Sequence, residues 1–214
     1  MGLEFLHVFE KWADSYDQSV LGNDIEYKEV FEGYHDILDE VVVLTNGKVM
    51  EFGSGTGNLT IKLLESGHHV IAVEPSLSMR KIAEQKILNR DQVRFVQGDF
   101  LHFPLLEKVD TIVSTLAFHH LTDEEKACAI KEYGKLLSKG GKIVFADTMY
   151  ESLDAYVLAI HEAEQAGYMN LAQDLQTEYY PTIPYLKSVF EENGYSVSFK
   201  RCNKFVWIFE AIKE

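Results

Sequence analysis

The fold follows from one stretch, Val49-Met50-Glu51-Phe52-Gly53-Ser54-Gly55-Thr56-Gly57-Asn58. A short apolar strand runs here into a loop with glycine at every second position, and a helical stretch comes next. Glycines let the backbone turn sharply and let a ligand come close, while the free amides of a helix N-terminus attract polar or anionic groups. The stretch therefore predicts a nucleotide-type binding loop between a strand and a helix.

Two better-known glycine loops do not match this stretch. A P-loop would need lysine after the last glycine, where Asn58 stands, and the motif G-x-x-x-x-G-K occurs nowhere in the chain. The glycines at 53, 55 and 57 also miss the dinucleotide fingerprint G-x-G-x-x-G by one position. Taken alone, the loop is also compatible with a glycine-rich turn that packs a helix on a strand.

Outward from the loop, short apolar runs alternate with helical stretches, which is typical of a parallel sheet built from strand–helix–strand units. We expect strands at 48–52, 69–73, 93–96, 110–115 and 142–146, and helices at 59–66, 77–88 and 122–138. A helix at 182–193 and two β-rich runs at 195–200 and 205–212 close the chain as an antiparallel hairpin. The prediction is an α/β fold with a doubly wound, mostly parallel, seven-stranded sheet.

Helical patterns also occur outside this alternation. Apolar stripes from Phe5 to Val20 and from Tyr27 to Val42 predict two N-terminal helices, and helices at 152–165 and 168–177 look like an insertion. We therefore expect one domain of 214 residues, divided into a helical cap at 1–45, a cofactor-binding core at 46–150, a helical insertion or lid at 151–180, and a C-terminal helix and hairpin at 181–214.

Acidic residues follow the second and third expected strands. Glu74 stands 21 residues after Gly53 (74 − 53 = 21), at the distance where a carboxylate accepts hydrogen bonds from ribose hydroxyls. Asp99, with Phe100 beside it, ends the third strand and is placed to bind an adenine edge. A solvated strand-end acid and a plain Gly-Asp turn are the alternatives for these two positions.

Composition limits the possible partners. The formal net charge of −14 would repel a phosphate backbone or an anionic membrane, and no apolar stretch approaches the ~20 residues of a membrane span. The two cysteines cannot form a disulfide framework, and no Cys/His cluster has zinc-site spacing, so no metal site is predicted. We expect a cytoplasmic protein that binds neither nucleic acid nor membranes; the sequence does not indicate its oligomeric state.

Five motifs together resemble the class I S-adenosylmethionine-dependent methyltransferases. They are the loop itself, Glu74, Gly98-Asp99-Phe100, Phe118-His119-His120-Leu121, and Leu136-Leu137-Ser138-Lys139-Gly140-Gly141. The opening Phe9-Glu10-Lys11-Trp12-Ala13-Asp14-Ser15-Tyr16-Asp17 and the chain length are similar to the small bacterial YrrT-like methyltransferases. The resemblance implies a Rossmann-like methyltransferase fold with S-adenosylmethionine as cofactor.

The resemblance also implies roles for single residues. Gly53, Gly55 and Gly57 would line the methionine and ribose portion of the cofactor. Glu51 would sit under the loop and steer the amino group of the ligand, although glutamate replaces the commoner aspartate there. Glu74 would bind the ribose.

Five further positions would complete the cofactor site. Met79 would pack near the adenine, and Asp99 and Phe100 would hold the adenine edge. Ser114 would offer its backbone or hydroxyl to the methionine part, and Tyr16 would close over the cofactor from the N-terminal helix.

Methyl transfer from a sulfonium is an in-line displacement, so the protein mainly aligns the acceptor and excludes water. A base helps only where the acceptor has a proton to lose. His119 and His120 follow the fourth strand at the edge where ligands bind in open α/β sheets, and either is a candidate catalytic residue that takes this proton or binds the acceptor. The alternative is that one histidine caps the turn and the other packs its ring.

Two other functions compete with methyl transfer to a small-molecule acceptor. A nicotinamide-dependent oxidoreductase would share the loop and the ribose acid, but no tyrosine is followed by lysine at the fourth position, as short-chain dehydrogenases require. A non-catalytic S-adenosylmethionine-binding protein remains open, because binding and catalytic residues coincide in this chemistry. No Asn-Pro-Pro-Tyr-like motif stands at Ser114–Phe118, which disfavours DNA bases and protein glutamine as acceptors.

Overall fold

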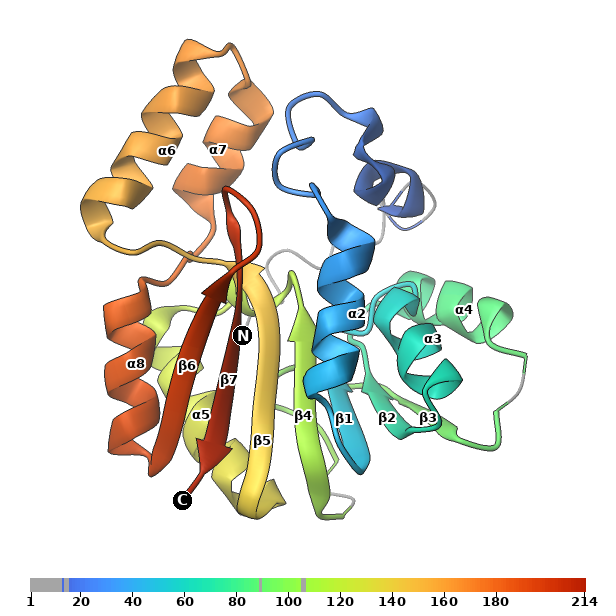
Figure 1. Ribbon diagram of the computed structural model, residues 1–214. Helices are drawn as coiled ribbons and strands as arrows, with labels where there is room; N and C mark the ends of the chain where they lie inside the picture. The colour runs from blue at the N-terminus through green and yellow to red at the C-terminus, as the bar shows by residue number, and fades with distance from the viewer. Residues whose placement is uncertain (1–12, 14–15, 89, 105–106) are drawn as a thin grey trace.

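The computed structural model describes residues 13, 16–88, 90–104 and 107–214. Their strands form one seven-stranded sheet in the order β3-β2-β1-β4-β5-β7-β6 (Figure 1). The strands are β1 (Lys48–Phe52), β2 (His69–Val73), β3 (Val93–Val96), β4 (Val109–Thr115), β5 (Leu137–Thr148), β6 (Tyr195–Arg201) and β7 (Val206–Lys213). The first five pair in parallel, and β7 pairs antiparallel with both β5 and β6. The predicted fold class is confirmed.

Helices cover both faces of this sheet (Figure 1). They are α2 (Tyr34–Leu44), α3 (Asn58–Glu65), α4 (Leu77–Lys86), α5 (Asp123–Leu136) and α8 (Ile183–Glu192). Alternate residues of β1 enter different cores: Val49 packs with α2 and α3, while Met50 and Phe52 pack with α5 and α8. This two-sided burial explains why the parallel strands read as short, continuous apolar runs.

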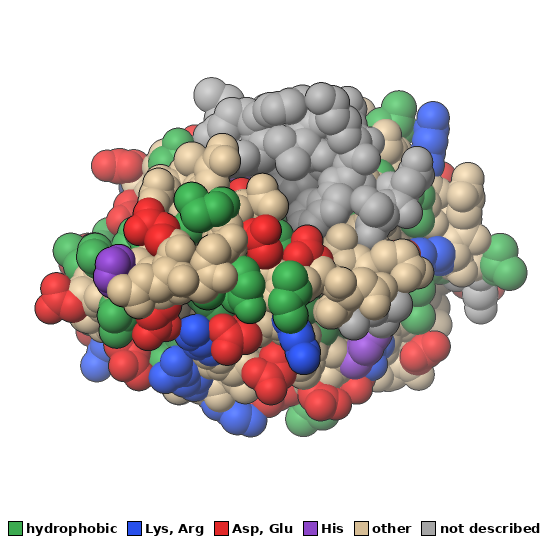
Figure 2. Space-filling model, turned by 90° about the horizontal axis from the view of Figure 1, so that it is seen from above, with side chains coloured by type: hydrophobic (Ala, Val, Ile, Leu, Met, Phe, Trp, Pro, Cys, Tyr) green, Lys and Arg blue, Asp and Glu red, His purple; other side chains and the backbone are tan. Residues whose placement is uncertain are grey.

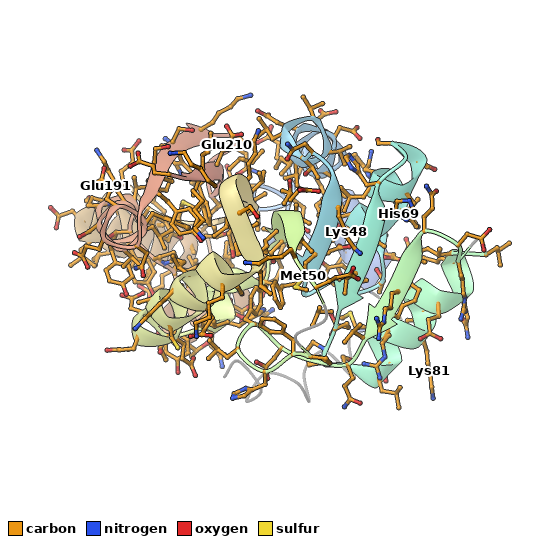
Figure 3. All side chains as sticks on the ribbon, turned by 90° about the horizontal axis from the view of Figure 1, so that it is seen from below. Lys48, Met50, His69, Lys81, Glu191 and Glu210 are labelled. Carbon is orange, nitrogen blue, oxygen red and sulfur yellow. The ribbon has the colours of Figure 1, made fainter. Side chains whose placement is uncertain are left out.

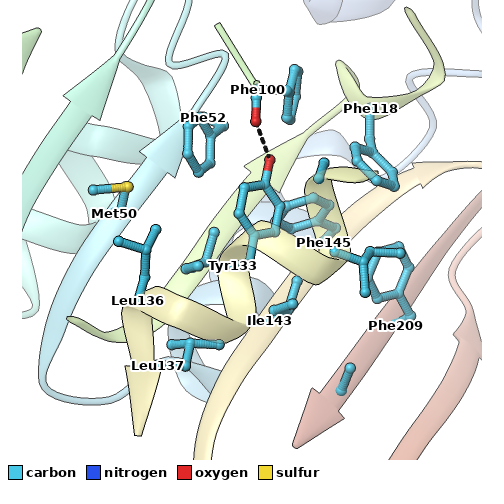
Figure 4. Packing of buried hydrophobic residues seen from close by; sticks show 14 of the residues in the cluster. Met50, Phe52, Phe100, Phe118, Tyr133, Leu136, Leu137, Ile143, Phe145 and Phe209 are labelled. Carbon is cyan, nitrogen blue, oxygen red and sulfur yellow. Dashed lines mark hydrogen bonds between the residues drawn. The ribbon is translucent and has the colours of Figure 1, made fainter. Parts of the chain in front are cut away.

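The core under α5 is dominated by aromatic rings. Phe52 stacks on both Phe100 and Tyr133, with ring centroids 5.5 and 5.0 Å apart. The Tyr133 hydroxyl donates to the carbonyl oxygen of Phe100, which lies in the loop after β3 (Figure 4). The core thereby fixes the loop that carries Asp99.

The two ends of the sheet differ. Seen from below, the starts of the parallel strands carry polar residues such as Lys48 and His69, which are register partners on β1 and β2 (Figure 3). Above the other end stand α6 (Leu153–Gln165), α7 (Met169–Thr177) and the N-terminal segment with the π-helix η2 (Ser19–Asn23) (Figure 1). The carboxyl ends of the parallel strands therefore point toward these added segments.

Among the described helices, none is long and apolar enough to span a membrane.

The N-terminal prediction needs a correction. The stripe from Tyr27 to Val42 is helical only from Tyr34, because residues 24–33 form turns and Gly33 is left-handed with φ +71°. Tyr27, Val30 and Phe31 in those turns still pack against the core, so their spacing reflects burial and not a helix. The stripe residues Phe5, Phe9 and Trp12 lie outside the described residues.

The other boundaries match closely, with one exception. Thr122 and Glu125 form a capping box at the start of α5. Strand β5, however, begins at Leu137, well before the expected position 142, and runs through Gly140-Gly141. The pair Gly140-Gly141, which follows the helix expected at 122–138, therefore lies within this longer strand.

Candidate functional site

The glycine loop joins β1 to α3 at the carboxyl end of the sheet. Gly53 has φ +63°, and a Cβ at this position would lie 2.8 Å from the Cβ of Ala117, so only glycine fits between the two strand-end loops. Gly55 has φ +54°, and a Cβ built there would contact Met79 Sδ at 3.8 Å and the Gly53 carbonyl oxygen at 4.0 Å, without a clash. The absence of a side chain at Gly55 therefore leaves room beside its backbone.

Glu74 lies against this loop, directly after β2. Its two carboxylate oxygens accept hydrogen bonds of 2.8 Å from the amides of Gly55 and Ser76. Burial raises the pKa of Glu74 to about 7, and the two amide hydrogen bonds only partly oppose this effect. Each carboxylate oxygen keeps a second lone pair, which a ligand hydroxyl can use.

Glu51 lies beneath the loop at the end of β1. It is 2% exposed, and one of its oxygens accepts a 2.6 Å hydrogen bond from the Thr60 hydroxyl of α3. Burial raises the pKa of Glu51 to about 8, and the charge of Glu74 adds to the shift. Two buried carboxyl groups with raised pKa values thus flank the loop, an arrangement that favours a cationic or hydroxyl-rich ligand.

The loop after β3 holds the next group of expected site residues. Asp99 is buried and uses one oxygen to accept the amides of Leu101 and His102, while its other oxygen lies 3.3 Å from His102 Nδ1. The Phe100 ring packs in the core between Phe52 and Phe118. The Gly-Asp turn that was the alternative interpretation of Asp99 is therefore present. The same turn fixes the Asp99 carboxylate at a strand end.

Two buried serine hydroxyls lack partners within the described part of the chain. They are Ser54 in the glycine loop and Ser114 at the end of β4, which are 5% and 1% exposed. A buried hydroxyl without a hydrogen bond costs about 1–3 kcal/mol, so such groups mark places where a ligand or water is expected.

The N-terminal segment docks on the same loop. Asp17 accepts hydrogen bonds from Thr56 and Asn58 and forms an ion pair with Lys86 of α4. Tyr16 is partly exposed, and desolvation together with the neighbouring Tyr34 raises its pKa well above the usual value; Glu74 contributes to the same shift. The role expected for Tyr16, closing over the cofactor, stays a prediction.

The loop after β4 carries both histidines. Leu116 has φ +50°, the only positive value at a non-glycine position among residues 13, 16–88, 90–104 and 107–214. This strained turn leads into the short 3₁₀-helix η3 (Phe118–His120), and the rings of His119 and His120 lie 4.1 Å apart between centroids. The Leu116 amide donates a hydrogen bond to the carbonyl oxygen of Ala146 on β5, which stabilises this unusual backbone conformation.

His119 lies between two carboxylates from distant parts of the chain. Its Nδ1 is 2.5 Å from Asp147 at the end of β5, and its Nε2 is 3.4 Å from Glu178, which follows α7. The Tyr180 ring stacks on the His119 ring at 5.0 Å, and its hydroxyl donates to Glu178. The structure therefore assembles a second polar cluster, built from β5, η3 and the segment after α7.

The two histidines differ in their electrostatic surroundings. Burial alone would lower the pKa of His119, but the carboxylates of Asp147 and Glu178 raise it overall. The pKa of His120 is held well below its usual value by burial and by the neighbouring His119. Adjacent positions in the sequence thus have opposite tendencies to carry charge.

The surface around this end of the sheet is acidic. Figure 2 looks down on it and shows several Asp and Glu side chains on the part of this face that is described. This distribution agrees with the net charge of −14.

Comparison with known proteins decides the family. A methyltransferase-domain family model matches residues 49–141. An uncharacterized methyltransferase of Bacillus mycoides (strain KBAB4) is 54% identical over 214 residues, which cover the whole of both chains. Another, from Geobacillus sp. (strain WCH70), is 56% identical over the full length of both. The chain belongs to this methyltransferase family.

Solved structures of other methyltransferases share the fold. Magnesium protoporphyrin IX methyltransferase from Synechocystis PCC 6803 with bound S-adenosylhomocysteine has a TM-score of 0.72 at 20% identity, over 97% of this chain and 99% of that one. A possible histamine N-methyltransferase from Thermotoga maritima has a TM-score of 0.70 at 19% identity, over 98% and 100%. The predicted class of S-adenosylmethionine-dependent methyltransferases is confirmed, and S-adenosylmethionine is the cofactor of this family.

The residues of the methyltransferase fit this cofactor. Glu74 offers the remaining lone pairs of a buried, fixed carboxylate, and Gly55 has no side chain beside it. Ser54 and Ser114 add two buried hydroxyls that have no partner among the described residues. A ribose diol and an amino acid tail are groups that can satisfy these donors and acceptors.

Sequence reasoning missed the other half of the histidine cluster. Asp147 stands at a strand end just as Glu74 does, so the same pattern would have indicated it. Glu178 follows an inserted helix and carries no local signal, because only the tertiary fold brings it to His119. Lys126 was also missed. Charged residues surround it in the helix sequence, so it looks like a surface residue, but its side chain is fully buried.

We expect Lys126 to matter for stability. Its ammonium group donates to the carbonyl oxygens of Leu121 and Tyr179 and lies 3.5 Å from Asp123. Lys126→Ala removes these donors and leaves a cavity, so the free energy of unfolding should fall by about 3 kcal/mol. The matched change at the exposed Lys131 of the same helix should cost less than about 0.5 kcal/mol. Urea unfolding of both variants checks this, and equal losses would show that Lys126 is not an anchor.

Proposed function

We propose that this methyltransferase transfers the methyl group of S-adenosylmethionine to a small-molecule acceptor. The observation that carries the proposal is the position of the Glu74 carboxylate. Its two oxygens are fixed by hydrogen bonds from the amides of Gly55 and Ser76. A carboxylate fixed in this way, beside an open glycine, supports a ribose-binding role. Met79 packs against the same opening.

The remaining cofactor contacts follow from position. Glu51 is proposed to steer the amino group of the ligand, and Ser114 to bind its amino acid portion. The Asp99 carboxylate and the Phe100 backbone are proposed to hold the adenine edge, and Tyr16 to close over the cofactor. S-adenosylmethionine supplies an activated methyl group when bound, so the chain has to align the acceptor and exclude water.

The acceptor is proposed to lie against His119 and His120. They stand after β4, the strand next to β1, and Ala117 in the same loop touches the position where a Gly53 Cβ would be. The two histidines would bind the acceptor or take its proton. The acidic face and the net charge of −14 support a small molecule over a nucleic acid.

We further propose that the chain works as one domain in the cytoplasm. Residues 46–150 would bind the cofactor, while 1–45 and 151–180 would cover it and 181–214 would complete the sheet. Contacts between the two covering segments support this arrangement: Glu26 accepts the amides of Asn170 and Leu171 at the start of α7, and Tyr27 donates to Asp174. Cys128 and Cys202 are both free, as expected in a reducing compartment.

Isothermal titration calorimetry of the full chain tests the proposed function. We expect saturable binding of S-adenosylmethionine and of S-adenosylhomocysteine at one site per chain, and no binding of NAD under the same conditions. Saturable NAD binding without adenosyl-sulfonium binding would refute the proposal in favour of an oxidoreductase. Cofactor binding without methylation of any thiol, amine or hydroxyl compound in a broad library would favour a non-catalytic S-adenosylmethionine-binding protein.

A further inference from the structure

We propose that His119, His120 and Glu178 bind one divalent transition-metal ion of the zinc class, with Asp147 supporting His119 from behind. The ring nitrogens and carboxylate oxygens of the three residues lie within 4.8 Å of one another. No local pattern indicates such a site, because two ligands are adjacent and the third follows an inserted helix. Spacing rules for zinc ligands therefore do not apply to it.

The ligand separations match those of a metal site. His119 Nε2 lies 3.4 Å from Glu178 Oε2, and His120 Nδ1 lies 3.8 Å from Glu178 Oε1. In a tetrahedral site with bonds of about 2.0–2.1 Å, neighbouring ligand atoms stand about 3.4 Å apart. The first of these separations equals this value and the second is somewhat longer, while all three donors lie within 4.8 Å of one another.

Asp147 provides a second, independent feature of a metal site. Its carboxylate accepts a hydrogen bond from His119 Nδ1 at 2.5 Å, and its other oxygen accepts the His119 backbone amide at 3.0 Å. Histidine ligands of metals usually donate their second ring nitrogen to a carboxylate, which fixes the tautomer and directs the other nitrogen at the ion. In this protein that other nitrogen faces Glu178.

The chain also fixes the third ligand. The Tyr179 amide donates to the His119 carbonyl oxygen at 2.9 Å, and the Tyr179 carbonyl oxygen accepts from buried Lys126 at 2.6 Å. The segment after α7 is therefore tied to both η3 and α5 at Tyr179, the residue directly after Glu178. The same tie holds Tyr180 on the His119 ring.

Charge favours a cation at this position. Asp147 and Glu178 face the histidines from two sides, and Asp174 acts on His119 from further away. Buried Lys126 is the cation whose charge acts on both histidines. A divalent ion would offset the excess of carboxylates and would be held by two imidazoles and one carboxylate, a ligand set that suits zinc and similar ions.

Three protein ligands leave a coordination position open. In the reaction of the proposed function, on which this step rests, an acceptor thiol or hydroxyl would take that position. A bond from sulfur or oxygen to the metal would form, and the proton would be released to solvent. The acceptor class implied by the site is therefore a thiol or hydroxyl compound that can bind the metal as an anion.

Metal binding is tested on the full chain after treatment with a chelator. We expect one Co²⁺ per chain to bind saturably, with visible absorption bands of a four- or five-coordinate site, and Zn²⁺ to displace it. His120→Ala and Glu178→Gln should abolish this binding. Asp147→Asn should weaken it by about 10–100-fold while leaving the ligands in place.

His161→Ala is the matched control. His161 and Glu164 form an exposed pair on α6, with Nδ1 3.9 Å from the carboxylate, and their loss should leave Co²⁺ binding unchanged. Calorimetry with S-adenosylhomocysteine on the same samples shows that the variants are folded and keeps this test separate from that of the proposed function. Absence of saturable Co²⁺ binding, or equal binding by wild type and Glu178→Gln, would overturn the metal site and leave a hydrogen-bonded histidine cluster.

Discussion

Replacing Glu74 by glutamine is expected to weaken the binding of S-adenosylmethionine by at least about a hundredfold, because two hydrogen bonds to a charged group are worth about 1.5–3 kcal/mol each. The loss has two causes. The side-chain amide can no longer accept ribose hydroxyls at both positions, and its NH₂ group must face either the Gly55 or the Ser76 amide, both of which are donors. The measurement is calorimetric titration with S-adenosylhomocysteine and S-adenosylmethionine.

Glu84→Gln is the control for this variant. Glu84 is on α4, where its side chain is 35% exposed and pairs loosely with Arg90 at 3.8 Å. It carries the same change of charge without touching the glycine loop, so its binding should match wild type. Wild-type affinity in Glu74→Gln would contradict the ribose-binding role.

Affinity for S-adenosylmethionine is expected to rise with pH. The pKa of Glu74 is about 7 and that of Glu51 about 8, both raised by burial, so near neutral pH much of each carboxyl group is protonated. A ligand with a sulfonium, an ammonium group and ribose hydroxyls binds the ionised carboxylates, and binding must release these protons. Glu74 alone should increase the affinity roughly tenfold between about pH 6 and pH 8.

The stability of the cofactor-free protein should change in the opposite direction. A carboxyl group whose pKa is raised in the folded state holds its proton more tightly when folded than when unfolded. The free energy of unfolding therefore falls as the pH rises from the ordinary carboxyl pKa of 4.5 through the folded values of about 7 and 8. Electrostatic strain at Glu51 and Glu74 would then be relieved by the bound cofactor.

Calorimetry at several pH values and urea unfolding over the same range check both trends. In Glu74→Gln the pH dependence of cofactor affinity should flatten, because one of the titrating groups is gone. Affinity that stays constant or falls with rising pH in the wild type would show that these carboxyl groups do not meet the cofactor.

Local patterns predicted most of the sheet and one side of the site. Buried parallel strands are short apolar runs, so β1, β2 and β3 appear at the expected residues, and the glycine loop and Glu74 lie together as strand-end residues should. The N-terminal region was harder, because turns that bury apolar residues imitate the helical stripe from Tyr27 onward. Gly33, with its left-handed backbone, marks the point where the real helix can begin.

The histidine cluster shows what a single sequence cannot reveal. His119 and His120 were recognisable from their place after a strand, but Glu178 reaches them only because α6 and α7 fold back over the sheet edge. In the sequence, Lys126 is one of many charged residues on an amphipathic helix. In the structure it is buried, and its ammonium group donates a hydrogen bond to the Tyr179 carbonyl oxygen. Such contacts depend on how distant segments pack and leave no periodic signal.

The most direct test of the account is a crystal structure of the methyltransferase with S-adenosylhomocysteine. We predict the ribose hydroxyls within hydrogen-bond distance of Glu74, the amino acid portion beside Ser114 and Glu51, and the sulfur directed toward the side of His119 and His120. An adenosyl group bound elsewhere, or a Glu74 side chain that makes no contact with it, would contradict the account.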